Sequence, residues 1–274
     1  MMTINCKGKL IDFSTPRVMG ILNITPDSFF DGGKYKNESE ILQQTEKMLS
    51  EGATFIDVGA YSSRPGAIHI SEEEELQRIV PVIELLVENF PDIIVSVDTF
   101  RSKVAKQTIN AGAAIINDIS GGNMDANMFA TIAELQVPYI VMHMLGTPQN
   151  MQQNPQYEDV TQEVIKFFAD QIHDLRQLKV NDVLIDVGFG FGKTIEHNYE
   201  LLKNLALFKN LDVPILAGIS RKSMLYKPLH ITAKTALNAT TSANTIALLN
   251  GANILRVHDV KEAAEAINIV QQLS

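Results

Sequence analysis

Eight short apolar segments recur along the chain, and their regular spacing restricts the possible folds more than any other feature of the sequence. Each segment is rich in β-branched residues and nearly free of polar alternation, which is typical of parallel strands covered on both faces. Segments with a helical period of apolar residues separate them. The predicted strands cover residues 18–24, 55–58, 93–97, 115–119, 139–142, 183–187, 215–219 and 254–257.

Strands that alternate with helices in this way predict an α/β protein with a parallel sheet. At 274 residues the chain is close to the length of about 250 residues that is usual for a (β/α)8 barrel, so we expect a single TIM barrel over residues 1–274. An open, doubly wound sheet is the alternative. Residues 1–15 are expected to form a short cover under the barrel. The predicted helices cover residues 38–50, 71–87, 102–110, 126–136, 160–178, 198–208, 235–250 and 261–272.

The composition narrows the class of partner and the cellular setting. Apolar residues make up 45% and charged residues 20% of the chain, which excludes a disordered or fibrous protein. A net charge of -9 argues against a nucleic acid or an anionic membrane as partner. Cys6 cannot form an internal disulfide because no second cysteine exists, no segment is long enough to span a membrane, and the N-terminus lacks the apolar stretch of a signal peptide. These features together predict a cytoplasmic location.

Four polar residues stand inside or at the end of predicted apolar strands: Asp98, Asn117, Asp186 and Lys222. In a (β/α)8 barrel the active site forms at the C-terminal ends of the strands, so we expect these side chains to meet in one mouth. A buried carboxylate is costly unless a partner satisfies it. A flat heterocycle with several N–H donors and ring acceptors would satisfy all four groups, because a carboxylate accepts two parallel hydrogen bonds from an amino-amide edge.

A second group of residues follows the predicted strands by a residue or two and is cationic or can become so. Arg64, Arg256 and His258, together with the hydroxyl of Ser63, suit an anion, and a phosphate group fits best. Asn23 and loop carbonyl groups could add oxygen ligands for a magnesium ion shared with that phosphate. The sequence therefore predicts two neighbouring sub-sites, one for a polar ring and one for a phosphate.

Purely structural roles are open for each of these residues. Asp98 and Lys222 could form an ion pair with each other in the core, and Asn117 could cap a turn. His143, which lies between two methionines, is expected to be a hydrogen-bonded core histidine rather than a ligand. The presence of polar residues at the ends of all eight predicted strands is harder to explain by structure than any one residue is.

Two further motifs look like ligand sites but have simpler explanations. The acidic residues 72–75 fall in the first turn of a predicted helix, where carboxylates complement the helix dipole. The glycine-rich residues 188–193 end in a lysine, yet they match neither the G-x-x-x-x-G-K-[ST] nor the G-x-G-x-x-G spacing, so we do not expect them to bind phosphate. We expect these glycines to let a flat ring lie against the backbone.

Seven motifs stand in order at the ends of the predicted strands. They are LNITPDSF at residues 22–29, SRPG at 63–66, SVDT at 96–99, NDISG at 117–121, GFGFGK at 188–193, SRKS at 220–223 and RVHD at 256–259. Together they resemble the motifs of the dihydropteroate synthase family of pterin-binding enzymes. Each motif alone is weakly specific, whereas seven in register are strongly specific.

The resemblance implies a reaction in which 4-aminobenzoate displaces diphosphate from (7,8-dihydropterin-6-yl)methyl diphosphate, giving 7,8-dihydropteroate. It also implies magnesium as cofactor, with Asn23 as a metal ligand, and a homodimer as the assembly. The pterin would lie on the four buried polar residues, and the diphosphate would lie on the cationic group. Ser63 and Ser223 fall where the family forms the 4-aminobenzoate pocket.

The resemblance also assigns roles residue by residue. The implied catalytic residues are Asp98, Arg64, Lys222, Arg256 and His258. The implied substrate-binding residues are Ser63, Asp98, Asn117, Met142, Asp186, Gly190, Phe191, Gly218, Lys222, Ser223, Arg256 and His258.

The chain departs from the family pattern at three positions. Val187 stands where a proline often follows the strand carboxylate, Tyr61 replaces a carboxylate, and Ser63 stands where threonine is usual. Two alternative functions share part of the predicted site: a pterin-dependent methyltransferase that acts on methyltetrahydrofolate, and a catalytically silent pterin-binding homologue. Neither alternative needs both the cationic group and the buried polar group.

Overall fold

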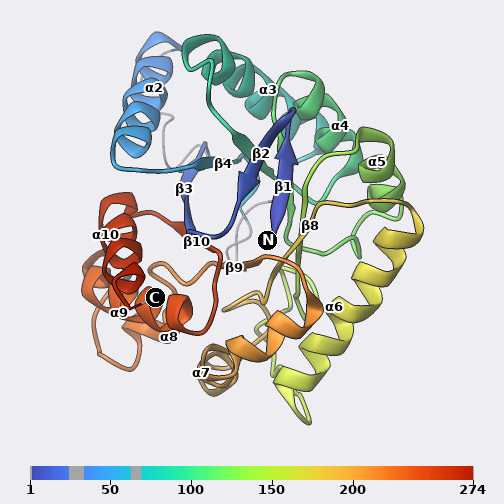
Figure 1. The fold of residues 1–274 in the computed structure, drawn as a ribbon. Helices are drawn as coiled ribbons and strands as arrows, with labels where there is room; N and C mark the ends of the chain where they lie inside the picture. The colour runs from blue at the N-terminus through green and yellow to red at the C-terminus, as the bar shows by residue number, and fades with distance from the viewer. Residues whose placement is uncertain (1, 25–33, 63–68, 274) are drawn as a thin grey trace.

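Eight parallel strands close into a barrel in the computed structural model, which describes residues 2–24, 34–62 and 69–273 (Figure 1). Around the barrel the order is β10-β3-β4-β5-β6-β7-β8-β9, so each strand pairs with its neighbour in the chain and the last strand pairs with the first. This confirms the predicted (β/α)8 barrel over the open sheet. The strands are β3 (Arg17–Asn23), β4 (Phe55–Gly59), β5 (Val95–Asp98), β6 (Ile115–Asp118), β7 (Tyr139–Met142), β8 (Val183–Asp186), β9 (Ile215–Ala217) and β10 (Ile254–Val257).

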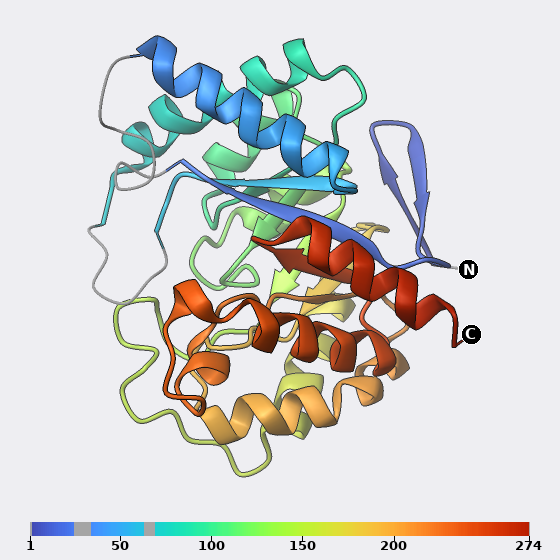
Figure 2. The same ribbon diagram turned by 90° about the vertical axis from the view of Figure 1, so that its left-hand side faces the viewer.

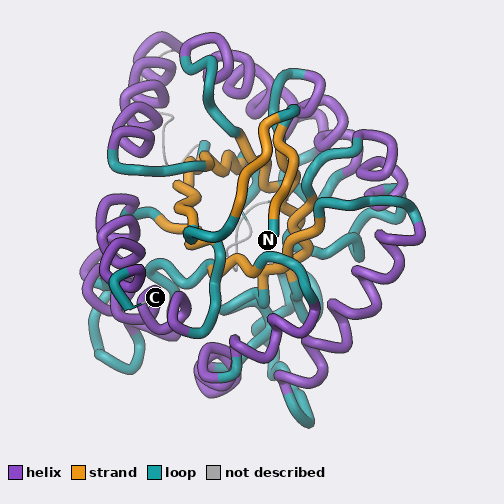
Figure 3. Tube along the Cα trace, viewed as in Figure 1, coloured by secondary structure: helices purple, strands orange, loops and turns teal. Residues whose placement is uncertain are grey.

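Helices form the outer ring of the barrel (Figure 3). The described helices are α2 (Lys34–Ser50), α3 (Glu72–Asn89), α4 (Ser102–Asn110), α5 (Met128–Leu135), α6 (Val160–Gln177), α7 (Ile195–Lys203), α8 (Ser223–Tyr226), α9 (Leu237–Leu249) and α10 (Val260–Gln271), with 3-10 turns η1 (Leu205–Leu211) and η2 (Ala233–Thr235). The helix predicted for residues 198–208 is wrong in its limits. Thr194 and His197 form a reciprocal capping box that starts α7 earlier, and the segment from Leu205 onward tightens into a 3-10 turn.

A two-stranded antiparallel hairpin, β1 (Thr3–Cys6) and β2 (Lys9–Asp12), closes the N-terminal end of the barrel. Ile4 and Ile11 of the hairpin are buried in one apolar cluster with Met19 and Phe55 at the start of the barrel strands. Figure 2 shows the hairpin and both chain termini at the same end of the molecule. The predicted cover is therefore present, and it leaves the opposite end of the barrel for chemistry.

The apolar core has separate layers along the barrel. The largest cluster fills the space between the strands and the surrounding helices, and the hairpin cluster closes one end. A third, smaller cluster lies at the C-terminal ends of the strands and includes Tyr61, Phe100, Met142 and Met144, with Phe191 packed against it. This third cluster forms an apolar wall beside the polar residues described next.

Candidate active site

Asp186 ends β8 inside the barrel mouth, where only 4% of the residue is exposed. Its Oδ1 atom accepts a hydrogen bond from the Gly188 amide at 2.8 Å. Burial raises the pKa of Asp186, while the positive charge of Lys222 lowers it. Oδ2 lies 3.3 Å from the position that a Cβ would occupy at Gly218, so the glycine keeps the space above this carboxylate open. The result is a buried carboxylate with acceptor capacity for a ligand.

Lys222 approaches the same point from the turn after β9. Its Nζ lies 3.9 Å from the position of a Cβ at Gly218, donates a hydrogen bond to the Phe189 carbonyl, and stands 4.7 Å over the Phe191 ring. Burial lowers the pKa of Lys222 to about 8, although Asp186 opposes this shift. The ammonium group therefore keeps donors that a ligand could use, because lysine has three and one is directed to Phe189.

Arg256 lies within β10, and its guanidinium bridges two carboxylates. Nε donates to Asp57 Oδ2 at 2.6 Å and Nη2 donates to Asp98 Oδ2 at 2.8 Å. Asn117 Nδ2 also donates to Asp57 Oδ2, at 3.1 Å. Asp98 therefore pairs with Arg256, and the alternative ion pair between Asp98 and Lys222 is wrong.

This bridge changes the predicted division into two sub-sites. Arg256 is predicted with the residues that bind an anion, but its guanidinium also bridges Asp57 and Asp98, because its long side chain reaches across the barrel mouth. Burial raises the pKa of Asp98, and the neighbouring Arg256 charge opposes the rise. The guanidinium thus contacts Asp57 and Asp98 and could also contact an anion bound above them.

The remaining predicted residues take separate positions at the rim. His258 is exposed, and its Nδ1 lies 3.0 Å from Ser220 Oγ. Ser223 is the first residue of α8, and Asn23 is the last residue of β3. Ser63 and Arg64 lie outside the described residues.

Met142, Gly190 and Phe191 line the boundary between the polar floor and the apolar wall. Met142 ends β7 with 3% of its surface exposed, and it belongs to the third apolar cluster. A Cβ at Gly190 would lie 3.4 Å from the Lys222 side chain. These residues thus lie beside Asp186 and Lys222.

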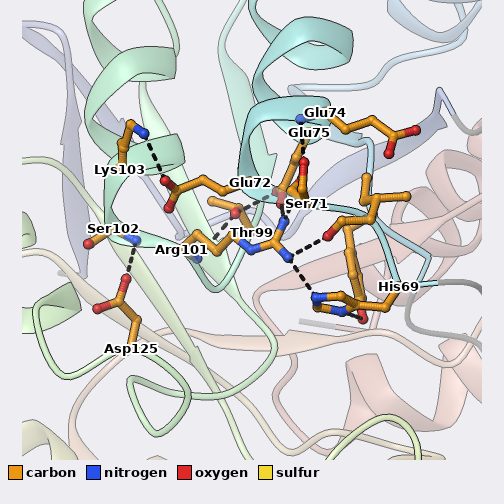
Figure 4. A network of polar contacts seen from close by, with 12 residues as sticks. His69, Ser71, Glu72, Glu74, Glu75, Thr99, Arg101, Ser102, Lys103 and Asp125 are labelled. Carbon is orange, nitrogen blue, oxygen red and sulfur yellow. Dashed lines mark hydrogen bonds and ion pairs between the residues drawn. The ribbon is translucent and has the colours of Figure 1, made fainter.

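Arg101 anchors the chain where it enters α3 (Figure 4). Its guanidinium pairs with Glu75 and donates to the carbonyl groups of Ile70, at 2.7 Å, and Ser71, at 3.2 Å. Thr99 donates to Glu75 at 2.7 Å. Glu75 has no exposed surface, so the expectation that residues 72–75 only complement the helix dipole is wrong for this member of the run.

Tyr61 connects this anchor to the apolar wall. Its hydroxyl lies 3.2 Å from His69 Nδ1, and its ring lies 5.0 Å from Phe100 with the two rings nearly perpendicular. The Arg101 guanidinium stands 5.5 Å over the Tyr61 ring. The aromatic residue that replaces the usual carboxylate therefore has partners of its own in this protein.

Two buried charged residues were not predicted to take part in the site. Asp57 has no exposed surface and holds both Arg256 and Asn117, and a carboxylate in an apolar strand was a signal that could have revealed it. Lys193 is 3% exposed, and its Nζ contacts His143 Nδ1 at 2.9 Å. His143 is the hydrogen-bonded core histidine that the sequence predicted.

Within the described residues, no group of three or more His, Cys, Asp or Glu side chains could hold a metal ion by itself. The same part of the chain has no helix that is long and apolar enough to cross a membrane. The mouth instead combines two carboxylates, an amide and a lysine with an apolar wall. This arrangement is suited to a flat, polar ring that carries an anionic group.

Comparisons with known proteins agree with this chemistry. A family model described as "Pterin binding enzyme" matches residues 19–258. The dihydropteroate synthase of Escherichia coli (strain K12) is 43% identical over 272 residues, which is 98% of this chain and 96% of that protein. The chain belongs to the dihydropteroate synthase family.

Solved structures of dihydropteroate synthases match the fold over nearly the whole chain. The Yersinia pestis enzyme, solved as a complex with a sulfonamide drug, has a TM-score of 0.93 and 43% identity and covers 99% of both chains. The Xanthomonas albilineans enzyme in complex with 7,8-dihydropteroate has a TM-score of 0.88 and 34% identity and covers 99% of this chain and 98% of its own. The buried polar group and the glycine-rich loop of this chain thus lie on a dihydropteroate synthase framework.

Proposed function

We propose that this protein condenses (7,8-dihydropterin-6-yl)methyl diphosphate with 4-aminobenzoate, giving 7,8-dihydropteroate and diphosphate. The observation that carries the proposal is the meeting of Asp98, Asn117, Asp186 and Lys222 at the C-terminal ends of β5, β6, β8 and β9. The names of relatives that are 43% identical support the same reaction.

The pterin ring binds on the buried polar floor. Asp186 accepts two parallel hydrogen bonds from the amino-amide edge of the ring, which offsets the cost of burying this carboxylate. Lys222 and Asn117 bind ring acceptors. Phe191 and Met142 supply apolar contact beside the ring.

The diphosphate leaves across the rim of the mouth. Arg256, His258 and Arg64 take up negative charge as the bond to the methylene carbon breaks, each through a charge-assisted hydrogen bond of about 1.5 to 3 kcal/mol. Asp57 and Asp98 orient the Arg256 guanidinium for this contact. A few such bonds lower the barrier by several powers of ten.

Asn23 and Asp98 suit a magnesium ion at this rim. Asn23 Oδ1 and Asp98 Oδ2 lie 3.5 and 3.7 Å from the position that a Cβ would occupy at Gly59, so an amide oxygen and a carboxylate oxygen flank one glycine. Mg²⁺ prefers such oxygen ligands and completes its shell with substrate phosphates and water. When bound, the ion would neutralise charge on the departing diphosphate.

The attacking amine needs no strong base. The arylamine of 4-aminobenzoate is neutral near pH 7, so attack depends on its position and on the stability of the cation left on the methylene carbon. Asp98 stabilises that cation, and the apolar wall excludes water from it. Ser63 and Ser223 hold the 4-aminobenzoate. A homodimer and a cytoplasmic location complete the proposal, and both derive from the sequence and the family.

An assay of diphosphate release tests the proposal. The purified protein is mixed with magnesium, the pterin diphosphate and 4-aminobenzoate, and diphosphate and 7,8-dihydropteroate are measured together. Equal amounts of the two products are expected, and Asp186→Asn is expected to weaken pterin binding. A protein that binds pterin but releases no diphosphate would instead be a methyltransferase or a silent homologue, which methyl transfer from methyltetrahydrofolate would separate.

A further inference from the structure

Lys193 is a buried lysine surrounded by neutral acceptors, and the proposed reaction does not use it. Only 3% of the residue is exposed. Its Nζ lies 2.9 Å from His143 Nδ1, 3.0 Å from Phe191 O, 3.1 Å from Gly188 O and 3.2 Å from His143 O. Among the described residues, Lys193 forms no ion pair. The negative charge of Asp186 still acts on Lys193, but the direct hydrogen-bond partners of the ammonium group are three carbonyl groups and one imidazole nitrogen, which hold it in a fixed geometry.

The acceptors belong to two different loops that touch at their backbones. His143 follows β7, whereas Gly188 and Phe191 lie in the loop after β8. A Cβ at Gly188 would lie 1.9 Å from His143 O, and its φ is +68°. A Cβ at Gly192 would lie 2.5 Å from Leu145 O. Only glycine permits these approaches, and the Lys193 ammonium binds both sides of the contact that results.

The loop after β8 reaches the proposed pterin site with its other face. Lys222 Nζ donates to Phe189 O and stands 4.7 Å over the Phe191 ring. A Cβ at Gly190 would lie 3.4 Å from the Lys222 side chain. Lys193 therefore holds the back of the loop whose front faces the ligand, so a shift at Lys193 would move the site.

The hydrogen bonds between Lys193 and its neighbours persist near neutral pH in either protonation state of the lysine. Burial lowers the pKa of Lys193 to about 7 and lowers the pKa of His143 to about 2, so the imidazole stays neutral. The ammonium form donates three hydrogen bonds to the four neighbouring acceptors. The neutral amine donates two and accepts one from the other imidazole tautomer. Both forms thus keep the two loops connected.

We propose that Lys193 is a positioning residue that ties the loop after β7 to the loop after β8 and so sets the place of Gly190 and Phe191 against the pterin ring. This inference rests on the proposed function for the identity of the ligand. A misplacement of about 1 Å in a site costs on the order of 100-fold in rate. Loss of Lys193 is therefore expected to lower kcat/KM for the pterin diphosphate by about 10- to 100-fold, with the loss in KM because the loop contacts the ring.

The first test compares Lys193→Met with Lys166→Met. Methionine keeps the length and volume of the side chain but removes all donors, and Lys166 is an exposed lysine on α6 that gives the same change in charge. At a temperature well below unfolding, Lys193→Met is expected to raise the KM for the pterin diphosphate while the KM for 4-aminobenzoate stays within about twofold. The control should match the parent for both. A Lys193→Met protein that is less stable but has parental KM values for both substrates overturns the inference.

The second test acts on the partner, and its two single variants do not depend on the folding of Lys193→Met. His143→Asn places an acceptor oxygen close to the position of Nδ1, whereas His143→Leu removes the acceptor. The KM for the pterin diphosphate is expected to stay nearer the parental value in His143→Asn than in His143→Leu. The double variant with Lys193→Met should change KM less than the product of the single changes. Equal KM values in the two His143 variants overturn the inference.

The third test separates this inference from the proposed function. The Phe191 amide donates to Gly188 O at 3.0 Å, and the Gly190 amide donates to Asn198 Oδ1 at 2.6 Å. Amide hydrogen exchange at these two positions is expected to accelerate at least tenfold in Lys193→Met, with the barrel strands unchanged. If the parent protein releases no diphosphate, the proposed function fails and this measurement still applies. Unchanged exchange in folded Lys193→Met overturns the inference.

Discussion

Lys193 and Lys222 both donate hydrogen bonds to carbonyl groups of the loop after β8, and they differ in what surrounds each ammonium group. Lys193 faces three backbone carbonyls and an imidazole nitrogen. Lys222 donates to one carbonyl and stands over an aromatic ring, and the negative charge of Asp186 acts on both lysines. Burial lowers the pKa of both lysines, to about 7 and about 8.

This difference shows that a depressed pKa does not by itself identify a ligand-binding lysine. The number of donors left over is more informative. The acceptors around Lys193 outnumber its three N–H groups, so it has none left to bind a ligand, whereas Lys222 directs one to Phe189 and keeps capacity. We therefore assign Lys222 to the pterin and Lys193 to the loop.

Gly188→Ala is expected to have the largest effect on stability, because it disrupts the contact between the loop after β8 and the loop after β7. Its Cβ would lie 1.9 Å from His143 O, and a φ of +68° is strained for alanine. The backbone fixes the Cβ position, and the His143 oxygen is itself a backbone atom, so no side chain can rotate to relieve the clash. We expect a loss of more than about 4 kcal/mol in the free energy of unfolding, or no folded protein. Chemical denaturation measures it, and a loss below about 1 kcal/mol would show that the two loops can separate freely.

Lys222→Met is expected to act on the front of the loop, with a large effect on binding and a small one on stability. Loss of a charge-assisted hydrogen bond should weaken pterin affinity by about 10- to 150-fold, which corresponds to about 1.5 to 3 kcal/mol. The free energy of unfolding should change by less than about 1 kcal/mol, since burying the ammonium group is itself costly. Calorimetry with a pterin that lacks the diphosphate, beside denaturant unfolding, separates the two. A large loss of stability with unchanged pterin affinity would instead give Lys222 the structural role proposed for Lys193.

The sequence predicted the polar residues around the proposed pterin site better than it predicted the hydrogen bonds of Lys193. A polar residue within an apolar strand is conspicuous, and this signal located Asp98, Asn117 and Asp186. The same signal is present at Asp57, within the apolar residues 55–58. Lys193 gave no such signal, because its partners are backbone carbonyls and one of its loops lies 50 residues away.

The barrel was predictable because strands buried on both faces appear as continuous apolar runs. The strand limits agree to within a few residues, as for β7, which was predicted for residues 139–142 and observed at Tyr139–Met142. Helix ends that depend on capping were less predictable, since the capping box of α7 has His197 at the third helical position, where a glutamate or glutamine is usual. The position of Arg256 between Asp57 and Asp98 could not be predicted from the sequence, because the three residues lie on different strands.

The pH dependence of catalysis should report Lys222 and not Lys193. The pKa of Lys222 is lowered to about 8, so the protonated form that binds the pterin is lost as pH rises through that value. We expect kcat/KM for the pterin diphosphate to fall by about tenfold per pH unit above pH 8. The alkaline limb should be absent in Lys222→Met and present in Lys166→Met. A limb that persists in Lys222→Met would assign the titration to another group.

The pH dependence of stability should report both buried lysines, with Lys193 contributing from a lower pH than Lys222. The pKa of Lys193 in the folded protein, about 7, is below the ordinary value of 10.5, so the unfolded chain binds more protons between these values. Stability should therefore rise with pH from about 7 towards 10, by up to about 1.4 kcal/mol per pH unit from this group. Replacement by methionine should remove this contribution. Parallel curves for the parent and Lys193→Met would show that the lysine is not buried as the structure has it.

Gly190→Ala is expected to have a much smaller effect on stability than Gly188→Ala, although both glycines lie in the same loop. The φ of +84° at Gly190 is strained for alanine, but its Cβ would meet only the Lys222 side chain, at 3.4 Å, which can move. We expect a loss of about 1 to 2 kcal/mol in the free energy of unfolding, from the left-handed backbone alone. The added methyl group faces Lys222, which is proposed to bind the pterin. We therefore expect the free energy of pterin binding to weaken by more than the free energy of unfolding falls, and calorimetry measures the binding. A variant with parental pterin affinity would mean that this face of the loop does not touch the ligand.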